Sequence, residues 1–251
     1  MTLTDLSAQA LSDAIHARQY ACREVMQAYI DRIGLINSRF NALVSLQPAE
    51  ILLRHADQCD LELSRGESKG WLHGIPLAFK DLVDVAGIPT TCGSELLRDN
   101  IPTKDALLVQ RLKAQGGIVI GKTNTPEFGA GSQTFNAVFG ATRNPYDLTK
   151  TCGGSSGGGA VAVACGMLPF ADGSDLAASL RNPGNYCNIV GFRPTPGRVP
   201  NWPNANAWDT QSTLGPMARS VEDAAFLFAS MAGPDARAPV SMSESGQRFS
   251  K

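Results

Sequence analysis

Long apolar runs and an excess of charge of one sign are both absent from this 251-residue sequence. No stretch approaches the about 18 consecutive apolar residues of a membrane-spanning helix, so we expect no membrane partner. The 22 Lys and Arg residues nearly balance the 23 Asp and Glu residues, which gives a net charge of −1. Nucleic-acid-binding domains are usually strongly basic, so this balance predicts no nucleic-acid partner.

Histidines and closely spaced cysteines, the usual ligands of zinc, are scarce. The chain has three histidines and six cysteines, and no two cysteines form a C-x-x-C pair. Residues 1–5 lack the basic and apolar regions of a secretory signal, so the even number of cysteines is weak support for disulfides. These features predict a cytoplasmic protein, in a reducing compartment, without a zinc site.

What the chain does contain is enough apolar sequence for a sizeable core. Apolar residues make up 43% of it and charged residues only 18%, below the roughly 25% of an average soluble domain. Periodicity predicts helices over residues 11–36 (one or two helices), 48–65, 105–115, 160–165 and 220–231, and strands over 75–80 and 117–120. Helices that alternate with short strands indicate an α/β fold.

Two short motifs with known chemistry occur in contexts that do not support that chemistry. Residues 116–123 match the P-loop string G-x-x-x-x-G-K-[ST], but the predicted strand lies between the two glycines instead of before the first. Residues 153–157 match the nucleophile-elbow string G-x-S-x-G, in which an acid and a histidine follow the serine. All three histidines precede residue 74, so we exclude an α/β-hydrolase triad.

A run of glycine and serine at residues 153–159 allows two interpretations. Gly/Ser tracts are commonly flexible linkers. Here a helix is predicted directly after the run, and a helix N-terminus preceded by glycines can bring backbone N–H groups close to a negative charge. Taken alone, the run fits a linker and an anion site equally well.

Several spaced motifs, in a fixed order along the chain, carry a resemblance to a known family. They read GIPLAFKD at residues 74–81, GKTNTPEF at 121–128, GGSSGG at 153–158, GSD at 173–175, SLR at 179–181, GFRPT at 191–195, GRV at 197–199, and LGPMARS at 214–220 followed by Asp223. The set resembles the amidase signature family over about residues 11–239. The resemblance implies an α/β fold in which helices flank a mixed β-sheet.

The resemblance also implies a Ser–Ser–Lys hydrolase of carboxamide bonds, a mechanism that requires no metal and no cofactor. On the matching positions, Ser179 would be the nucleophile, Ser155 the bridging serine on a cis peptide, and Lys80 the base. Serine becomes a strong nucleophile when a base removes its proton, and lysine can be that base when burial lowers its pKa. Apolar residues surround Lys80 in the sequence, which suits this role. Considered without the serine motifs, Lys80 would instead be expected to pair with Asp81 or Asp84.

The loop around the nucleophile would supply oxyanion donors and supporting contacts. The implied donors are the backbone N–H groups of Leu176, Ala177, Ala178 and Ser179. Three further residues are implied to hold the surrounding loops in place: Ser156, Asp175 and Arg181. The family usually has Gly-Gly where this chain has Ala177-Ala178. If either position needs a positive φ, alanine costs on the order of 1 kcal/mol or more there.

Members of this family normally continue well past residue 239, so the resemblance implies that the chain carries only the N-terminal half of the fold. We expect a helical segment over residues 1–66, the signature core over 67–232, and a polar tail over 233–251. An incomplete sheet would favour a homo-oligomer or association with the missing C-terminal portion.

Three functions follow as alternatives. The first is an amidase that hydrolyses a small-molecule amide through an acyl-enzyme on Ser179. The second is the glutamine-hydrolysing subunit of an amidotransferase, which needs partner proteins. The third is an inactive, truncated amidase fragment. Aryl, aliphatic, peptide and cyclic amides are all compatible with the sequence as substrates.

Overall fold

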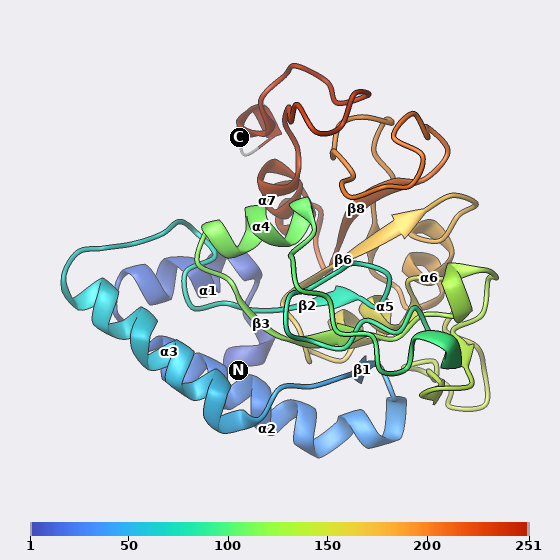
Figure 1. The fold of residues 1–251 in the computed structure, drawn as a ribbon. Helices are drawn as coiled ribbons and strands as arrows, with labels where there is room; N and C mark the ends of the chain where they lie inside the picture. Colours follow the sequence, from blue (N-terminus) through green and yellow to red (C-terminus); the bar gives the residue numbers. More distant parts are fainter. Residues whose placement is uncertain (1, 250–251) are drawn as a thin grey trace.

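The helices and strands of the computed structural model, which describes residues 2–249, form the α/β arrangement that the sequence predicts (Figure 1). The α-helices are α1 (Ala8–His16), α2 (Cys22–Phe40), α3 (Ala49–Ser64), α4 (Leu107–Ala114), α5 (Gly157–Ala164), α6 (Arg181–Tyr186) and α7 (Val221–Met231). The strands are β1 (Leu43–Val44), β2 (Pro76–Lys80), β3 (Ile118–Thr123), β4 (Phe135–Asn136), β5 (Gly140–Ala141), β6 (Phe170–Asp175), β7 (Val190–Gly191) and β8 (Thr213–Ala218). The short 3-10 helices are η1 (Leu3–Asp5), η2 (Glu95–Leu97), η3 (Glu127–Gly129) and η4 (Gly246–Phe249).

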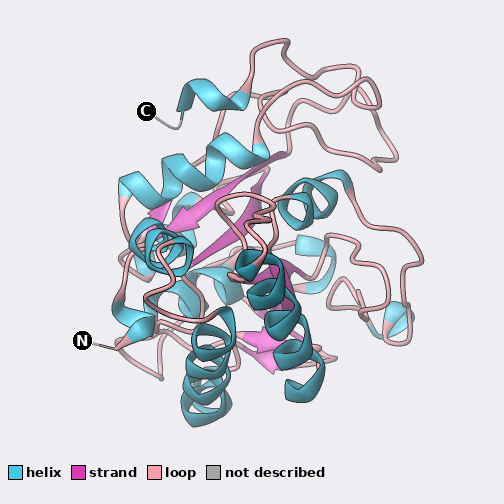
Figure 2. Cartoon of the chain, turned by 90° about the vertical axis from the view of Figure 1, so that its left-hand side faces the viewer, coloured by secondary structure: helices cyan, strands magenta, loops and turns pink. Residues whose placement is uncertain are grey.

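Within residues 2–249, the main strands form two three-stranded sheets. In the first sheet, β3 lies between β1 and β2, antiparallel to β1 and parallel to β2. In the second, β8 lies between β6 and β7 and is antiparallel to both. β2 and β6 contact each other where the two sheets meet (Figure 1). Helices surround the strands in the view of Figure 2, which confirms the prediction of a mixed sheet flanked by helices.

Helix α5 packs against β2, β3, β6 and β8 and so bridges the two sheets. Its residues 157–163 are all buried, as expected for a helix that is apolar on every side. A Cβ atom on Gly158 would lie 2.2 Å from the backbone nitrogen of Asn124, so only glycine fits this close approach. The helix begins three residues before the predicted position. Its first turn consists of glycines, whose low helix propensity argues against a helix there, but tertiary packing overrides that propensity.

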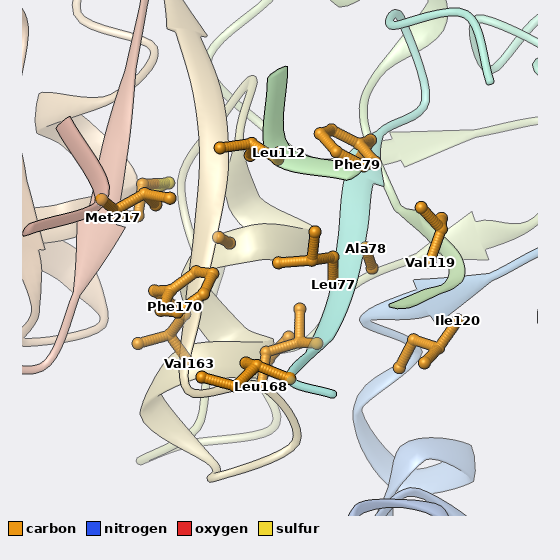
Figure 3. Close-up of a cluster of buried hydrophobic side chains, with 14 of the residues drawn as sticks. Leu77, Ala78, Phe79, Leu112, Val119, Ile120, Val163, Leu168, Phe170 and Met217 are labelled. Carbon is orange, nitrogen blue, oxygen red and sulfur yellow. The ribbon is translucent and has the colours of Figure 1, made fainter. Parts of the chain in front are cut away.

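The apolar core gathers at the junction of the two sheets. Figure 3 shows Leu77 of β2, Val163 of α5 and Phe170 of β6 within one buried cluster. Side chains alternate along a strand, so Leu77 and Phe79 lie on one face of β2 while Lys80 belongs to the other. Among residues 2–249, no helix has both the length and the apolar character needed to cross a membrane.

Both ends of the described chain pack against α7. The carboxylate of Asp223 accepts hydrogen bonds from the N–H groups of Ala8, at 2.9 Å, and Gln9, at 3.1 Å, at the start of α1. Near the other end, the ring of Phe249 packs on that of Phe228, with centroids 4.7 Å apart. Helix α7 contacts β8 as well, so these contacts connect both ends to the second sheet.

Candidate active site

Lys80, the last residue of β2, is completely buried, and its amine contacts three serine hydroxyls. Its Nζ lies 2.7 Å from Oγ of Ser155, 3.0 Å from Oγ of Ser156 and 2.9 Å from Oγ of Ser174. An ammonium group has three N–H donors, and a neutral amine has two donors and one lone pair. The three hydroxyls therefore satisfy the amine in either protonation state.

Burial lowers the pKa of Lys80 to about 7, although the negative charges of Asp172 and Asp175 act in the opposite direction. The group is therefore a base that is partly neutral near pH 7. Within residues 2–249, Lys80 forms no ion pair with Asp81 or Asp84, the partners expected from its sequence neighbourhood alone. Hydroxyl groups, not carboxylates, surround the amine.

Ser155 is buried and follows a cis peptide bond from Gly154. Its carbonyl oxygen accepts a hydrogen bond from Oγ1 of Thr125, at 3.0 Å. On the other side of the loop, a Cβ atom on Gly154 would lie 2.9 Å from the backbone nitrogen of Gln133. Close packing on both sides thus holds the loop that directs the Ser155 hydroxyl to Lys80.

Ser156 and Ser174 join the start of α5 to the end of β6. Oγ of Ser156 accepts a hydrogen bond from the N–H of Ser174, at 3.2 Å, and donates one to its carbonyl oxygen, also at 3.2 Å. Because both hydroxyls also contact Lys80, the lysine, the helix start and the strand end form one hydrogen-bonded unit.

Ser179 lies between β6 and α6, and only 9% of its surface is exposed. Its carbonyl oxygen accepts a hydrogen bond from the N–H of Ser156, at 3.2 Å, which connects the two serine-containing loops. Within the described part of the chain, its hydroxyl makes no hydrogen bond, so Oγ is available to a bound molecule. The structure therefore brings Lys80 and Ser155 into direct contact and links Ser179 to them through Ser156.

Asp175, at the end of β6, is a buried carboxylate that organises the loop before α6. It accepts hydrogen bonds from the N–H groups of Ala178, at 2.8 Å, and Leu180, at 3.1 Å. It also pairs with Arg181, at 3.0 Å, and Arg193, at 2.9 Å. Burial by itself would raise the pKa of this carboxyl, but the hydrogen bonds from Arg181, the loop N–H groups and Arg193 hold the pKa well below its usual range. Asp175 therefore remains ionised and keeps the loop in this shape.

The same loop contains the four backbone N–H groups that the family resemblance implies as oxyanion donors. The N–H of Ala178 is already bonded to Asp175. In the described residues, the N–H groups of Leu176, Ala177 and Ser179 make no hydrogen bond. Three of the four groups are thus unoccupied by protein acceptors, and Ala178 serves the loop instead.

Ala178 has a left-handed backbone conformation, with φ at 75°. A Cβ atom makes this conformation unfavourable by about 1–2 kcal/mol, and glycine removes that penalty at some cost in chain entropy. Replacing Ala178 with glycine is therefore expected to stabilise the fold by about 1 kcal/mol, which raises Tm by roughly 2–4 °C in a chain of this size. Thermal unfolding followed by circular dichroism measures the change.

The matched control for this prediction is Ala177→Gly. Ala177 is the neighbouring residue, but its φ is not positive. Glycine there only adds freedom to the unfolded chain, so Tm should stay level or fall. If both variants rose equally, or if Ala178→Gly lowered Tm, the backbone of Ala178 would not be a source of strain.

Three residues of this site were given no role from the sequence. Asp172 and Ser174 lie two positions apart on β6, on the face that meets Lys80, and the Lys80 N–H donates to Oδ1 of Asp172 at 2.9 Å. Arg193 lies in the GFRPT motif and pairs with Asp175. A period-two pattern through Asp172 and Ser174 could have indicated the first two. It was obscured because FADGSD contains residue types that are rare in strands.

A second cluster, of metal-binding residue types, consists of Cys59, Glu62 and His73, with ligand atoms within 4.8 Å of one another. Nε2 of His73 donates to the carbonyl oxygen of Cys59 at 2.9 Å, and Nδ1 accepts from the N–H of Lys69 at 3.2 Å. The Lys69 amine also pairs with Glu62. Both nitrogens of His73 therefore have partners, and the cluster offers no imidazole lone pair to a metal.

Comparison with known proteins bears on the site and on the length of the chain. The family model described as Amidase matches residues 24–250. The chain is 41% identical over 235 residues to a glutamyl-tRNA(Gln) amidotransferase subunit of Alkaliphilus metalliredigens, covering 94% of this chain and 48% of that protein. It is 39% identical over 237 residues to an acylamidase of Rhodococcus erythropolis, covering 94% and 50%. A solved bacterial aryl acylamidase of the amidase signature family superposes with a TM-score of 0.90 at 33% identity, covering 96% of this chain and 50% of that one. The chain thus spans about half the length of the relatives it matches.

Proposed function

The chain belongs to the amidase family, and on that premise we propose that it hydrolyses a carboxamide C–N bond through an acyl-enzyme on Ser179. The observation that carries this proposal is the completely buried amine of Lys80, which lies 2.7 Å from the hydroxyl of Ser155. The lowered pKa of Lys80, about 7, provides a neutral amine at physiological pH. General bases are most effective when their pKa lies near the working pH.

In the proposed acylation, Ser155 passes its proton to Nζ of Lys80 and takes up the proton of Ser179. Oγ of Ser179 bonds to the amide carbon, and the electron pair of the C=O bond moves to oxygen. Collapse of this intermediate breaks the C–N bond, while the proton held by Lys80 returns through Ser155 to the leaving nitrogen. Water then attacks the ester by the same relay, which releases the acid and restores Ser179.

Two features of the site support this relay. The hydroxyls of Ser156 and Ser174 can stay bonded to Lys80 whether or not the amine carries the extra proton, so the lysine amine keeps its place during the transfer. The unoccupied N–H groups of Leu176, Ala177 and Ser179 are proposed to stabilise the negative oxygen of the intermediate.

Reaction with a fluorophosphonate tests the proposal without a known substrate. The wild-type chain is expected to gain the mass of one phosphonyl group, measured by intact-mass spectrometry, because an activated serine displaces fluoride from phosphorus. Ser179→Ala should gain none, and Ser7→Ala, at the N-cap of α1, should react like the wild type. Failure of the folded wild-type chain to react would overturn the proposal and favour an inactive fragment.

A second candidate function is that of a glutamine-hydrolysing component of an amidotransferase. Its support is the 41% identity to a protein described as part of such an enzyme. Preference for glutamine over other amides, together with co-purification of a partner protein, would favour it. Hydrolysis of aryl or peptide amides by the chain alone would favour the free amidase.

The setting of the reaction is part of the same proposal. We place the site in a signature core over residues 67–232, in a cytoplasmic protein that acts on a small-molecule amide. All six cysteines lie within residues 2–249 and are free thiols, as a reducing compartment favours. Assembly into a homo-oligomer, or with a further portion of the fold, is proposed because the chain spans about half the length of its relatives.

A further inference from the structure

Asp172, in β6, is a buried carboxyl group to which the proposed relay gives no role. Its Oδ1 accepts a hydrogen bond from the backbone N–H of Lys80, at 2.9 Å. Its Oδ2 is buried and has no hydrogen-bond partner in the described residues. Buried polar atoms are nearly always hydrogen-bonded, so an unpartnered oxygen on a residue that is bonded to the backbone of Lys80 requires an explanation.

Strand β6, which carries Asp172, contacts Lys80 both at its backbone and at its amine. Asp172 bonds to the backbone of Lys80, and Ser174, two residues further along the same face of β6, contacts its Nζ at 2.9 Å. The carboxyl therefore lies on the strand that borders Lys80, inside the same water-excluded region. The pairing of β6 with β8 places Asp172 opposite Pro216, which has no N–H to donate.

We infer that Asp172 is a positioning residue that supplies the counter-charge for the proton taken up by Lys80. This inference rests on the proposed function. When Nζ accepts a proton from Ser155, a cation forms in a buried site, where an isolated charge is strongly unfavourable. A carboxylate fixed on the neighbouring strand stabilises that cation by direct electrostatic attraction. Because no donor is bonded to Oδ2, its charge acts through space on the nearby buried lysines, Lys122 as well as Lys80.

The ionisation of the two groups agrees with this role. Burial raises the pKa of Asp172 to about 6, against the opposing effects of the Lys80 N–H and of the charges on Lys122 and Lys80. The carboxyl is therefore mostly ionised where Lys80, with a pKa of about 7, takes up and releases its proton. Asp175 adds a second negative charge, but its oxygens are bonded to arginines and to loop N–H groups.

The other elements packed against β6 contribute few charges. Helix α5 and strand β8 contain no titratable side chain. Helix α7 contributes two carboxylates: Glu222 is exposed, and the buried Asp223 is bonded to the start of α1. On β3, Lys122 is buried, and its Nζ donates to the carbonyl oxygen of Val83 and to Oγ1 of Thr90. Asp172 is thus the carboxylate with an unbonded oxygen near Lys80.

The variant Asp172→Asn separates charge from structure. Asparagine keeps a carbonyl oxygen that accepts from the Lys80 N–H, but it removes the negative charge. The pKa of Lys80 should fall. The acid limb, which is the rise of the fluorophosphonate reaction rate with pH, should therefore move to lower pH by roughly one unit or more. The plateau rate should fall about tenfold, because protonated Lys80 loses its stabilisation during the reaction. A purely structural loss would lower the plateau and leave the limb in place.

Thr123→Val is the matched control. Thr123 is a fully buried residue of β3, where it pairs with Lys80 of β2. Its Oγ1 also has no hydrogen-bond partner in the described residues, but it carries no charge. This variant should keep the acid limb of the wild type. An unmoved limb in Asp172→Asn, or the same shift in Thr123→Val, would overturn the inference.

A measurement on the wild-type chain does not depend on folding of the variants or on reactivity. In protein with ¹³C-labelled lysine and aspartate, the Cε signal of Lys80 and the Cγ signal of Asp172 should each show both titration steps, because the two groups interact. If the Asp172 signal titrated with no response from Lys80, the inference would fail. If the signals were coupled but the chain did not react with fluorophosphonate, the hydrolase proposal would fail and the charge coupling would stand.

Discussion

Replacing Lys80 with methionine is expected to slow phosphonylation of Ser179, and any amide turnover, by roughly 10³-fold. Methionine fills a similar volume, but it has no atom that can take the proton of Ser155, which lies 2.7 Å from Nζ. The wild-type rate should rise about tenfold per pH unit up to about pH 7, the pKa of Lys80, and level off above it, because only the neutral amine is a base. The variant should lose this dependence together with its rate.

Rates of adduct formation between pH 5 and 9, followed by intact-mass spectrometry, test both parts of this prediction. Lys122→Met is the matched control. Lys122 is equally buried, and burial lowers its pKa to about 8. Among residues 2–249, its Nζ bonds to Val83 and Thr90 and to no serine. It should keep a measurable rate with an acid limb. If Lys80→Met kept the wild-type profile, Lys80 would not be the base.

Replacing Asp175 with asparagine is expected to cost about 2–3 kcal/mol of unfolding free energy, because the buried loop N–H groups and two partly exposed arginines lose an ionised acceptor. The amide loses the charge that faces Arg181 and Arg193. Its NH₂ group also cannot accept the hydrogen bonds that Oδ2 receives from Leu180 and Arg181. The loop that carries Ser179 should lose its shape, so reactivity should fall as well.

The contribution of Asp175 should also depend on pH in a defined direction. Its pKa is lower in the folded chain than in the unfolded one, so the unfolded chain binds more protons on the acid side. The stabilisation is therefore complete above about pH 4–5 and is lost as the pH falls toward the folded pKa. Urea unfolding at several pH values should show the wild type losing more stability on acidification than Asp175→Asn.

Asp235→Asn provides the comparison for this variant. Asp235 pairs with Arg237 at 2.9 Å near the surface, and the hydrogen bond from Arg237 lowers its pKa to about 2. Exposed ion pairs are worth about 0–1 kcal/mol, so this change should have a small effect. Equal losses in the two variants would contradict a special role for the buried carboxylate.

Sequence patterns predicted the helices better than the strands, for reasons visible in individual segments. The helix expected over residues 220–231 is found at 221–231, because Ser220 caps it and an apolar face follows. Strands β6 and β8 were not predicted. Their sequences, FADGSD and TLGPMA, contain glycine, proline and aspartate, and they form strands because tertiary packing buries them.

The motifs located the residues of the candidate site but not the contacts between them. They pointed to Lys80, Ser155 and Ser179, and the buried amine of the first contacts the second. They could not show that the N–H of Ala178 is bonded to Asp175, since that depends on how the chain turns after β6. The string at residues 116–123 was correctly rejected as a P-loop, because its central residues form the buried strand β3.

The division of the site between two sheets also affects how the chain acquires reactivity as it folds. Lys80 ends a strand of one sheet, while Ser174 and Asp175 end a strand of the other, and they come together only where β2 meets β6. Contacts between residues so far apart in sequence form slowly, because a long loop must close before they gain any free energy. Helices such as α2 and α3 are built from local contacts and need no such closure. During folding, the chain should therefore become reactive toward a phosphonylating reagent only after the two sheets have packed together.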